Sequence, residues 1–324
     1  MDKHYFRSDP QLNNALEKVN LLINQRISIN NKDLQSALHQ MASKGGKYLR
    51  PAFCLTFARL GGKEWNSEKL IKIASSLEIL HMATLIHDDV IDDSPKRRGA
   101  PSIQTAFGKD TAVYSGDLLF TVFFDLLVET MSNSSYLTIN AQAMRKILAG
   151  ELRQMDKRFQ QQSLLEYYRN INGKTATLFS LAAQEGAHFG GADAQTVHLA
   201  KHIGQNIGIT FQILDDMLDY SSNEKLNKPI LEDLATGVYS LPLLLVLKDH
   251  QDAFKPYLDK KQDMTVADTE AVQKLVNEYG GVEKAHQLAG KFTNKALQLI
   301  DELPKSATQK LLKRVTKQLL NRSM

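Results

Sequence analysis

The sequence predicts an all-α fold, with one large helical domain over residues 1–324. Apolar residues recur with the period of an amphipathic helix nearly everywhere, as at Leu34, Leu38 and Met41, spaced i, i+4 and i+7. No segment of the sequence shows the alternation of apolar and polar residues that a half-buried strand requires. No stretch rich in Pro, Gly or Ser separates two halves of the chain, so one domain is expected rather than two.

Glycine pairs and a proline predict where successive helices end. The pairs occupy positions 45–46, 61–62, 190–191 and 280–281. A continuous apolar stripe from Ala285 to Ile300 predicts a helix that ends before Pro304. The polar segment 221–237, which contains Lys228, predicts a surface loop of the length that is usually functional or mobile.

Composition and charge argue against several classes of protein. The 40 basic and 36 acidic residues give a formal net charge of +4, which is too small over this length for a nucleic-acid binder. We therefore expect any functional basic residues to lie together at a local site. The most apolar run, residues 241–247, is far shorter than the roughly 20 residues that cross a bilayer, so no membrane span is expected. Cys54 is the single cysteine and the first residues lack a signal-peptide pattern, so we expect a cytoplasmic location.

Two copies of the pattern Asp-Asp-x-x-Asp are the most unusual feature. They consist of Asp88, Asp89 and Asp92, and of Asp215, Asp216 and Asp219. Residues i and i+4 share one face of a helix, so the first and third aspartates of each copy form a pair of carboxylates one turn apart. Such a pair becomes favourable when a cation lies between the two groups. All-oxygen ligands favour Mg²⁺, particularly when substrate phosphates complete its coordination.

A solvated acidic surface is the alternative interpretation of these aspartates. In a chain of this composition one all-Asp triad arises by chance in roughly one chain in twenty, and two in roughly one in several hundred. Both copies are also bracketed by Ile, Leu, Val or Met, as in helices that enter a core. The metal-site interpretation is therefore favoured.

Three groups of basic residues agree with a phosphorylated substrate. They are Lys47 and Arg50 after the first glycine pair, Arg97 and Arg98 after the first aspartate copy, and Lys174 with Thr175 after Gly173. Each could hold diphosphate oxygens through charge-assisted hydrogen bonds, and we expect the last group to open a helix and add backbone N–H donors. Each group alone is weak evidence for a diphosphate site, but the presence of all three indicates one.

In this order the motifs resemble the trans-polyprenyl diphosphate synthase family over essentially the whole chain. The matching residues are Gly45-Gly46-Lys47, Arg50-Pro51, His81, His87-Asp88-Asp89, Asp92, Arg97-Arg98-Gly99, Pro101, Gly150-Glu151, Gln154, Gly173-Lys174-Thr175-Ala176, Phe211-Gln212, Asp215-Asp216 and Asp219-Tyr220. The resemblance implies helices around a deep central cavity, usually in a homodimer, with the two aspartate copies facing each other across the cavity mouth. It also implies Mg²⁺-dependent head-to-tail condensation of isopentenyl diphosphate with an allylic diphosphate, with about three Mg²⁺ per site.

The resemblance further implies a role for each site residue. Metal ligation falls to Asp88, Asp92 and Asp215, with Asp89, Asp216 and Asp219 as direct or indirect support. The allylic diphosphate would be held by Arg97, Lys174, Thr175, Gln212 and Lys228, and isopentenyl diphosphate by Lys47, Arg50, His81 and Arg98. His81 is then a substrate contact and His87 a packed or supporting residue, because magnesium prefers oxygen to nitrogen.

Three positions after the second aspartate copy depart from the family's usual pattern. Val238 stands where a lysine usually helps to bind the allylic diphosphate, and Asn227 and Leu231 replace loop glycines. These departures leave three consequences open: weaker affinity for the substrate, a loop that closes differently, and reduced activity.

Side chains preceding the first aspartate copy predict the length of the product. On a helix, Ala83 and Thr84 lie on the cavity wall one turn before the aspartates, and Leu80 lies deeper. In the family that the motifs resemble, large aromatic residues at these positions are associated with short products. The resemblance therefore implies that the two small residues leave a long tunnel, with a product on the order of 30 to 40 carbons. Phe123, on a neighbouring helix, is either the tunnel floor or an ordinary core residue.

The leading hypothesis is therefore a prenyltransferase that makes a quinone side-chain precursor. A shorter-chain geranylgeranyl or farnesyl synthase is the alternative within the family. A heteromeric synthase, in which this chain needs a partner subunit, is a further one, and the intact aspartate copies favour the catalytic member of such a pair.

Overall fold

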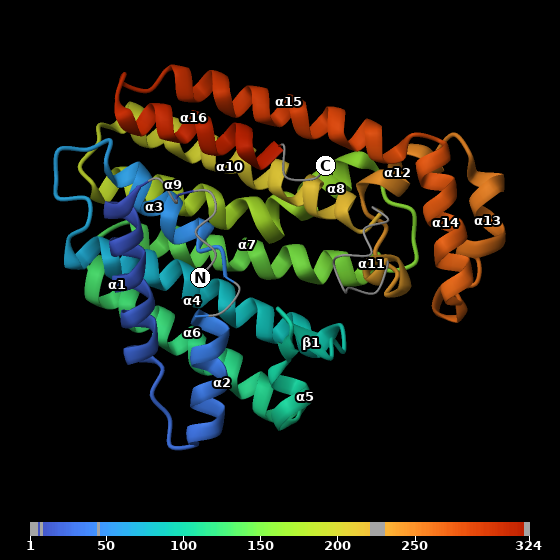
Figure 1. The fold of residues 1–324 in the computed structure, drawn as a ribbon, viewed down its shortest axis with the longest axis horizontal. Coiled ribbons are helices and arrows are strands. Elements are labelled where there is room, and N and C mark those ends of the chain that lie inside the picture. Colours follow the sequence, from blue (N-terminus) through green and yellow to red (C-terminus); the bar gives the residue numbers. More distant parts are fainter. Residues whose placement is uncertain (1–5, 7–8, 44–45, 221–230, 321–324) are drawn as a thin grey trace. The chain divides into compact units, whose positions relative to one another are not determined.

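The computed structural model describes residues 6, 9–43, 46–220 and 231–320, and these are helical almost throughout, as the sequence predicts (Figure 1). Contacts divide the chain into two compact units. The first unit comprises the described residues of Met1–Ala141, Leu181–Lys201 and Pro304–Thr308, and the second those of Gln142–Ser180, His202–Leu303 and Gln309–Met324. The single domain expected from the sequence stays a prediction.

The first unit is built around one long buried helix, α4. Its helices are α1 (Pro10–Arg26), α2 (Lys32–Ser43), α3 (Leu49–Ala58), α4 (Glu68–Ile91), α5 (Ile103–Phe107) and α6 (Lys109–Met131). Helix α4 packs against α1, α3, α5 and α6, and Leu77, Leu80 and Ala83 on it have at most 1% of their surface exposed. The unit also holds a two-stranded antiparallel hairpin of β1 (Lys96–Arg97) and β2 (Ala100–Pro101), which the sequence did not predict.

Four helices contribute residues to both units. They are α7 (Tyr136–Asp156), α9 (Thr177–Phe189), α10 (Ala194–Leu218) and α16 (Ala307–Leu320). In the first unit, α9 lies close to α3 because Gly186 has no side chain. A Cβ atom there would lie 2.0 Å from the carbonyl oxygen of Cys54.

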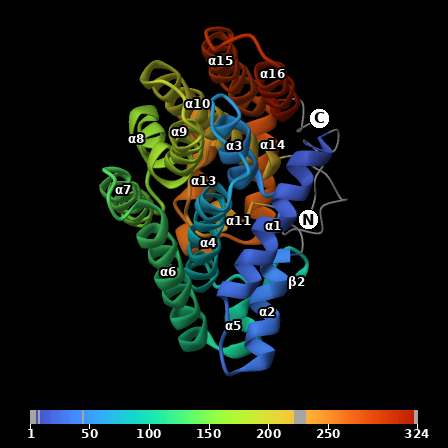
Figure 2. The ribbon, with the colours of Figure 1, turned by 90° about the vertical axis from the view of Figure 1, so that its left-hand side faces the viewer.

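The second unit has its own hydrophobic core, formed mainly by α10, α12, α14 and α15. Its further elements are α8 (Leu164–Ile171), a π-helical turn (Asn172–Ala176), α11 (Glu232–Ala235), α12 (Leu241–Leu247), α13 (Gln251–Leu258), a short 3₁₀ turn (Lys261–Asp263), α14 (Val266–Glu278) and α15 (Gly281–Asp301). Ile213, Tyr220, Leu241, Val272 and Ala285 belong to this core. Figures 1 and 2 both show α16 beside α15.

Most of the predicted helix ends are confirmed. Helices α3, α9, α14 and α15 end within a few residues before the pairs at 61–62, 190–191 and 280–281 and before Pro304. Gly191 (φ +89°) and Gly280 (φ +72°) take the left-handed conformation that glycine adopts at little cost. The pair at 45–46 lies partly outside the described residues.

Helices α4 and α6 are long and apolar enough to cross a membrane by length and composition alone, which the sequence analysis did not anticipate. Within the structure, 72% of the apolar window of α4 and 44% of that of α6 is buried, and the two helices pack against each other. Core helices of folded proteins meet the same criteria, so burial identifies α4 as a core helix.

The predicted surface loop at 221–237 is wrong over its described part. Residues 231–237 contain helix α11, and Leu231 and Leu234 are buried in the core of the second unit. The apolar side chains of these two residues anchor the segment.

Candidate active site

The first aspartate copy lies at the C-terminal end of α4. The backbone N–H of Asp92 donates to the carbonyl of Asp88 at 2.9 Å, which closes the last helical turn and sets the two residues one turn apart, as predicted. Asp88 is half-buried and Asp92 exposed. Asp89 lies on another side of the helix and is 2% exposed.

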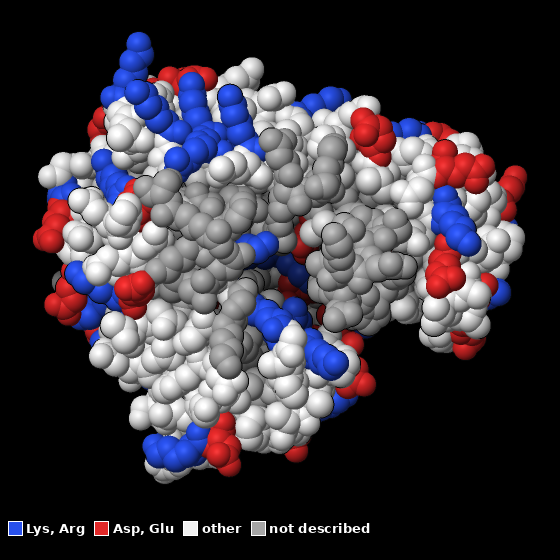
Figure 3. Space-filling view, viewed as in Figure 1, with Lys and Arg blue, Asp and Glu red and all other residues white. Residues whose placement is uncertain are grey.

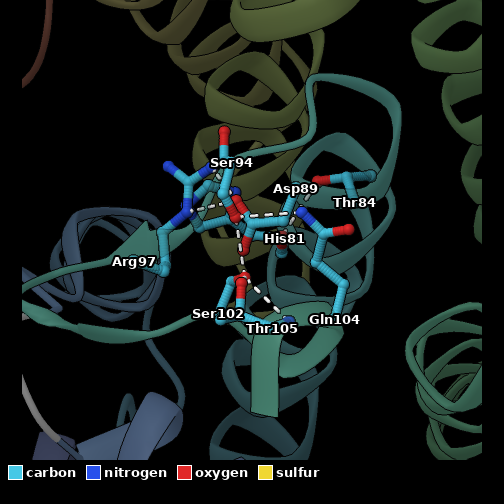
Figure 4. A network of polar contacts seen from close by, with 8 residues as sticks. All are labelled: His81, Thr84, Asp89, Ser94, Arg97, Ser102, Gln104 and Thr105. Atoms are coloured by element: carbon cyan, nitrogen blue, oxygen red, sulfur yellow. Dashed lines mark hydrogen bonds and ion pairs between the residues drawn. The ribbon is translucent and has the colours of Figure 1, made fainter. Parts of the chain in front are cut away.

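Asp89 pairs with Arg97, which the hairpin brings back over the end of α4 (Figure 4). The Nε of Arg97 donates to Oδ1 of Asp89 at 2.8 Å, and Nη2 contacts the same oxygen. Burial raises the pKa of Asp89, while the guanidinium opposes that rise. The buried carboxylate therefore holds Arg97, one of the residues expected to bind the allylic diphosphate.

Polar contacts fix the loop that carries Arg97. Ser102 donates from Oγ to the carbonyl of Ser94 at 2.7 Å, and Gln104 donates from Nε2 to the same carbonyl at 3.1 Å (Figure 4). The hydroxyls of Ser102 and Thr105 lie 2.9 Å apart. These bonds join the hairpin to the start of α5 and so limit the positions that Arg97 can take.

The residues expected to bind isopentenyl diphosphate gather in the first unit. Burial, and then the charges of Arg50, Arg98 and Arg97, hold the pKa of His81 well below its usual range, so its imidazole is neutral at pH 7. Arg98 donates from Nη1 to the carbonyl of Met41 at 3.2 Å. A Cβ atom at Gly46 would lie 2.8 Å from that same Nη1, so glycine at this position leaves room for Arg98.

The turn that carries Lys47 and Arg50 is anchored by Tyr48, which lies between them and is 1% exposed. Its hydroxyl donates to the carbonyl of Ala42 at 2.7 Å and accepts from Nδ2 of Asn20 at 2.7 Å. Lys47 and Arg50 are both half-buried.

Glu78 is a buried charged residue of this region that the sequence analysis missed. It lies on α4 one turn before His81, is 2% exposed, and interacts electrostatically with Arg50 and Arg98. Burial raises the pKa of Glu78, and the two guanidinium groups act against the rise. A glutamate inside the run Leu77-Glu78-Ile79-Leu80 was the signal in the sequence.

The second aspartate copy, at the end of α10, follows the same plan as the first. Asp215 is exposed and Asp219 half-buried, whereas Asp216 is 4% exposed. Asp216 accepts hydrogen bonds from the hydroxyl of Tyr167 at 2.8 Å, from Nε2 of Gln212 at 2.9 Å and from the backbone N–H of Leu241 at 3.2 Å. Burial raises the pKa of Asp216 to about 7, although the three hydrogen bonds act to lower it. Asp216 thus links α8, α10 and α12.

Lys174 and Thr175 lie in the π-helical turn between α8 and α9. The expected helix start at Gly173 is wrong, because helical backbone angles continue from Ile171 through Thr177. No new helix therefore begins at Gly173, but a π-helical insertion of this kind often marks a functional site. Lys174 pairs with Glu151 of α7, Nζ to Oε2, at 2.9 Å.

The π-helical turn is also joined to the second aspartate copy. Thr175 donates from Oγ1 to Oε1 of Gln212 at 2.6 Å, and Gln212 donates onward to Asp216. Two glycines let the turn lie against α7. A Cβ atom at Gly150 would lie 2.9 Å from the backbone nitrogen of Lys174, and one at Gly173 would lie 2.9 Å from the carbonyl oxygen of Lys146.

Of the residues that depart from the family pattern, Leu231 and Val238 are described. Leu231 has φ +61°, in the left-handed region where glycine is usual, and its side chain is 1% exposed. Val238 is half-buried and donates from its backbone N–H to the carbonyl of Asp233 at 2.7 Å. Asn227 and Lys228 lie outside the described residues.

The predicted chain-length residues lie on the packed helices α4 and α6. Leu80 and Ala83 are buried, and Thr84 is half-buried with Oγ1 donating to the carbonyl of His81 at 2.9 Å. Phe123 on α6 is fully buried, and its ring lies 5.3 Å from that of the exposed Phe124. The role of these residues in product length stays a prediction.

His87 is a packed residue, as expected. Its Nε2 lies 3.2 Å from the carbonyl oxygen of Val113 and 3.4 Å from Oδ1 of Asp117, and its ring packs against Phe120. A Cβ atom at Gly116 would lie 2.3 Å from the same Nε2, so glycine allows this contact.

The aspartate pairs fit magnesium that is shared with a phosphorylated substrate. Among residues 6, 9–43, 46–220 and 231–320, no three His, Cys, Asp or Glu side chains converge into a cluster that could hold a metal ion by itself. Each pair therefore offers at most two carboxylates. Mg²⁺ commonly binds one or two carboxylates and takes its other ligands from water and substrate phosphates.

Comparison with known proteins gives the family. The model of the polyprenyl synthetase family matches residues 31–279. The chain belongs to this family.

It is similar to heptaprenyl diphosphate synthase component 2 of Geobacillus stearothermophilus, with 35% identity over 86% of each chain. Among solved structures, it is similar to geranylgeranyl pyrophosphate synthase of Lactobacillus brevis (TM-score 0.94, 40% identity, 99% and 100% of the two chains) and to heptaprenyl diphosphate synthase of Staphylococcus aureus (TM-score 0.92, 34% identity, 97% and 99%).

As a polyprenyl synthetase, the protein is a prenyltransferase that makes all-trans prenyl diphosphates. Its fold is the all-α fold of the solved isoprenoid synthases. The names of its relatives span geranylgeranyl, heptaprenyl and nonaprenyl diphosphate synthases, so family membership defines the reaction but not the chain length of the product.

Proposed function

We propose that the protein condenses isopentenyl diphosphate with an allylic diphosphate into an all-trans product on the order of 30 to 40 carbons, a quinone side-chain precursor made in the cytoplasm. One observation carries the proposal for the site. In both aspartate copies the first and third residues are exposed or half-buried, while the second is buried and bonded inward, Asp89 to Arg97 and Asp216 to Tyr167. Each copy therefore presents one pair of carboxylates from a rigid helix end.

Magnesium ions held by Asp88, Asp92, Asp215 and Asp219 would neutralise the diphosphate that leaves the allylic substrate. Arg97 and Lys174 add positive charge at the leaving group, and their partners Asp89 and Glu151 orient them before substrate arrives. Thr175 and Gln212 would bind the same diphosphate, as would Lys228, which lies outside the described residues.

The reaction then needs no nucleophilic side chain. The allylic C–O bond breaks and its electron pair stays on the diphosphate. The double bond of isopentenyl diphosphate attacks the allylic cation, and the released diphosphate takes the proton that is lost from the new chain. Lys47, Arg50, His81 and Arg98 would hold isopentenyl diphosphate, with the neutral His81 as a hydrogen-bond partner rather than a charge.

The small residues Ala83 and Thr84 support the long product, and so do the relatives named heptaprenyl diphosphate synthase. A geranylgeranyl-type synthase is the second candidate, favoured by the 40% identity to the Lactobacillus brevis enzyme. Phe123 would then be the floor of a shorter tunnel.

The protein assembles, in this proposal, as a homodimer through α6. Tyr114, Phe124 and Val128 on that helix are 74%, 41% and 57% exposed, an apolar face typical of an interaction surface. The name "component 2" of one relative supports a heteromeric synthase as the alternative, in which a partner subunit covers the same face.

The test is incubation of the purified protein with farnesyl diphosphate, labelled isopentenyl diphosphate and Mg²⁺, followed by chromatography of the products. A ladder that ends near 30 to 40 carbons supports the proposal, and one that ends near 20 supports the second candidate. Absence of product, in a protein that binds Mg²⁺ and diphosphate by calorimetry, would indicate a required partner or a site impaired at Val238.

A further inference from the structure

Helix α16 carries one strongly basic face. Lys310, Arg314 and Lys317 are all exposed and are spaced i, i+4 and i+7, which places them along one side of the helix. The apolar residues Leu312, Val315 and Leu319 are buried and hold the helix against the fold. Lys and Arg side chains gather over α16 in the space-filling view (Figure 3).

Helix α16 as a whole carries as much positive charge as the net charge of the chain. Residues 307–320 contain four of the 40 basic residues and none of the 36 acidic ones, so the rest of the chain is formally neutral. Lys313, the fourth cation of the helix, pairs with Asp301, and the neighbouring helix α15 carries two further exposed lysines, Lys291 and Lys295. The charge that appeared dilute in the sequence is therefore concentrated on one helix.

We propose that the basic face of α16 docks the enzyme on the anionic headgroups of a lipid bilayer. Each cation near an anionic membrane is attracted to its surface within about a Debye length, and the contributions of three cations in one row add. The face bears no exposed large apolar side chain among residues 307–320, so contact with headgroups rather than insertion is expected.

The chemistry of the proposed product agrees with this partner. The polyprenyl chain of a product on the order of 30 carbons is strongly apolar and its diphosphate is charged, so the product favours the interface of a bilayer over water. This argument rests on the proposed function, whereas the argument from charge does not.

The test is co-sedimentation of the full chain with vesicles that contain phosphatidylcholine alone or phosphatidylcholine with phosphatidylglycerol. We expect binding to the mixed vesicles that weakens as salt is added, and little binding to phosphatidylcholine. The triple variant K310E/R314E/K317E should lower the partition coefficient by at least on the order of a hundredfold, since each cation contributes a factor of roughly five. The neutral variant K310Q/R314Q/K317Q, milder for folding, should lower it on the order of a hundredfold.

The matched control is K248E/K261E/K274E, which makes the same change in net charge at exposed lysines of the same unit. It should retain most of the binding, and circular dichroism should show equal helix content in all variants. Equal loss in the control, equal binding of all variants, or no binding of the wild type would overturn the proposal. Preference for duplex DNA over the mixed vesicles would also overturn it. Because the assay contains no substrate, its outcome is independent of prenyl transfer.

Discussion

Asp89 and Asp216 hold the same position in the two aspartate copies, and each turns inward for the same geometric reason. Neighbours on a helix point about 100° apart, so a residue beside an outward-facing aspartate faces a different environment. Asp89 meets Arg97 there, and Asp216 meets Tyr167 and the start of α12. The helical period predicted the paired carboxylates at i and i+4. It could not say which side of each helix is buried, because that depends on neighbours distant in the sequence.

Replacing Tyr167 by phenylalanine removes one of the donors to the buried carboxylate of Asp216. We expect the free energy of unfolding to fall by about 1–3 kcal/mol, as measured by urea denaturation. Tyr168→Phe is the matched control, because Tyr168 is half-buried and its ring packs against Phe292. Equal stability of the two variants would contradict the role given to Tyr167.

Glu185 predicts a pH dependence of stability in the first unit. It is fully buried on α9, accepts from Nδ2 of Asn140 at 2.5 Å, and burial raises its pKa from 4.5 to about 8. The folded protein therefore keeps a proton that the unfolded chain releases. The resulting stabilisation is complete below the unfolded pKa and is lost as pH rises through about 8.

We expect the free energy of unfolding to fall by a few kcal/mol between about pH 5 and pH 8. Urea titrations across that range measure it. Glu185→Gln, which stays neutral, should remove the part of the slope that Glu185 contributes and leave the part due to Asp216, whose pKa is also raised, to about 7. Glu283→Gln at an exposed site on α15 should leave the whole slope unchanged. A Glu185→Gln protein with the wild-type slope would show that other groups cause the dependence.

The helices illustrate what sequence patterns can predict for an element. Glycine pairs and Pro304 marked helix ends correctly, because left-handed glycines and prolines act through local backbone geometry. The hairpin β1–β2 escaped notice, since two-residue strands are too short to alternate. The continuous helix through Gly173 was also missed, because packing against α7 decides it.

The close packing of Gly173, in the π-helical turn, against α7 can be tested by adding one methyl group at this position. Gly173→Ala should lower the free energy of unfolding by about 1–3 kcal/mol, because the new Cβ would lie 2.9 Å from the carbonyl oxygen of Lys146. Gly290→Ala on α15 is the control, since nothing lies within 4 Å of a Cβ there. Alanine should stabilise that helix by about 0.5–1 kcal/mol. Thermal melts of both variants give the comparison, and a harmless Gly173→Ala would refute the packing argument.

Helix α4 carries the prediction for product length. Ala83→Phe places a ring on the expected wall of the tunnel and should shorten the longest product by at least one five-carbon unit, as read by chromatography. Ala83→Ser keeps the size of the side chain and serves as the control. If Ala83→Phe makes product of unchanged length, α4 does not line the tunnel at this position.

At the scale of the whole molecule, the exposed face of α6 predicts self-association. Phe124→Glu with Val128→Glu should raise the dissociation constant of a homodimer at least about tenfold, because two charges would enter an apolar interface. Sedimentation velocity measures it. Leu21→Glu on α1, 60% exposed, is the control. A wild-type protein that sediments as a monomer would instead favour a heteromeric assembly.

The pairing of Arg97 with Asp89 has a consequence for the kinetics of substrate capture. An arginine side chain carries about 2 kcal/mol of rotamer entropy, and most of it is lost once the guanidinium is fixed. Because Asp89 fixes Arg97 when the protein folds, most of this rotamer entropy is lost on folding and little is left to be lost when diphosphate binds. The arriving anion meets a cation already oriented, so association should be limited by diffusion and charge rather than by a search among side-chain conformations.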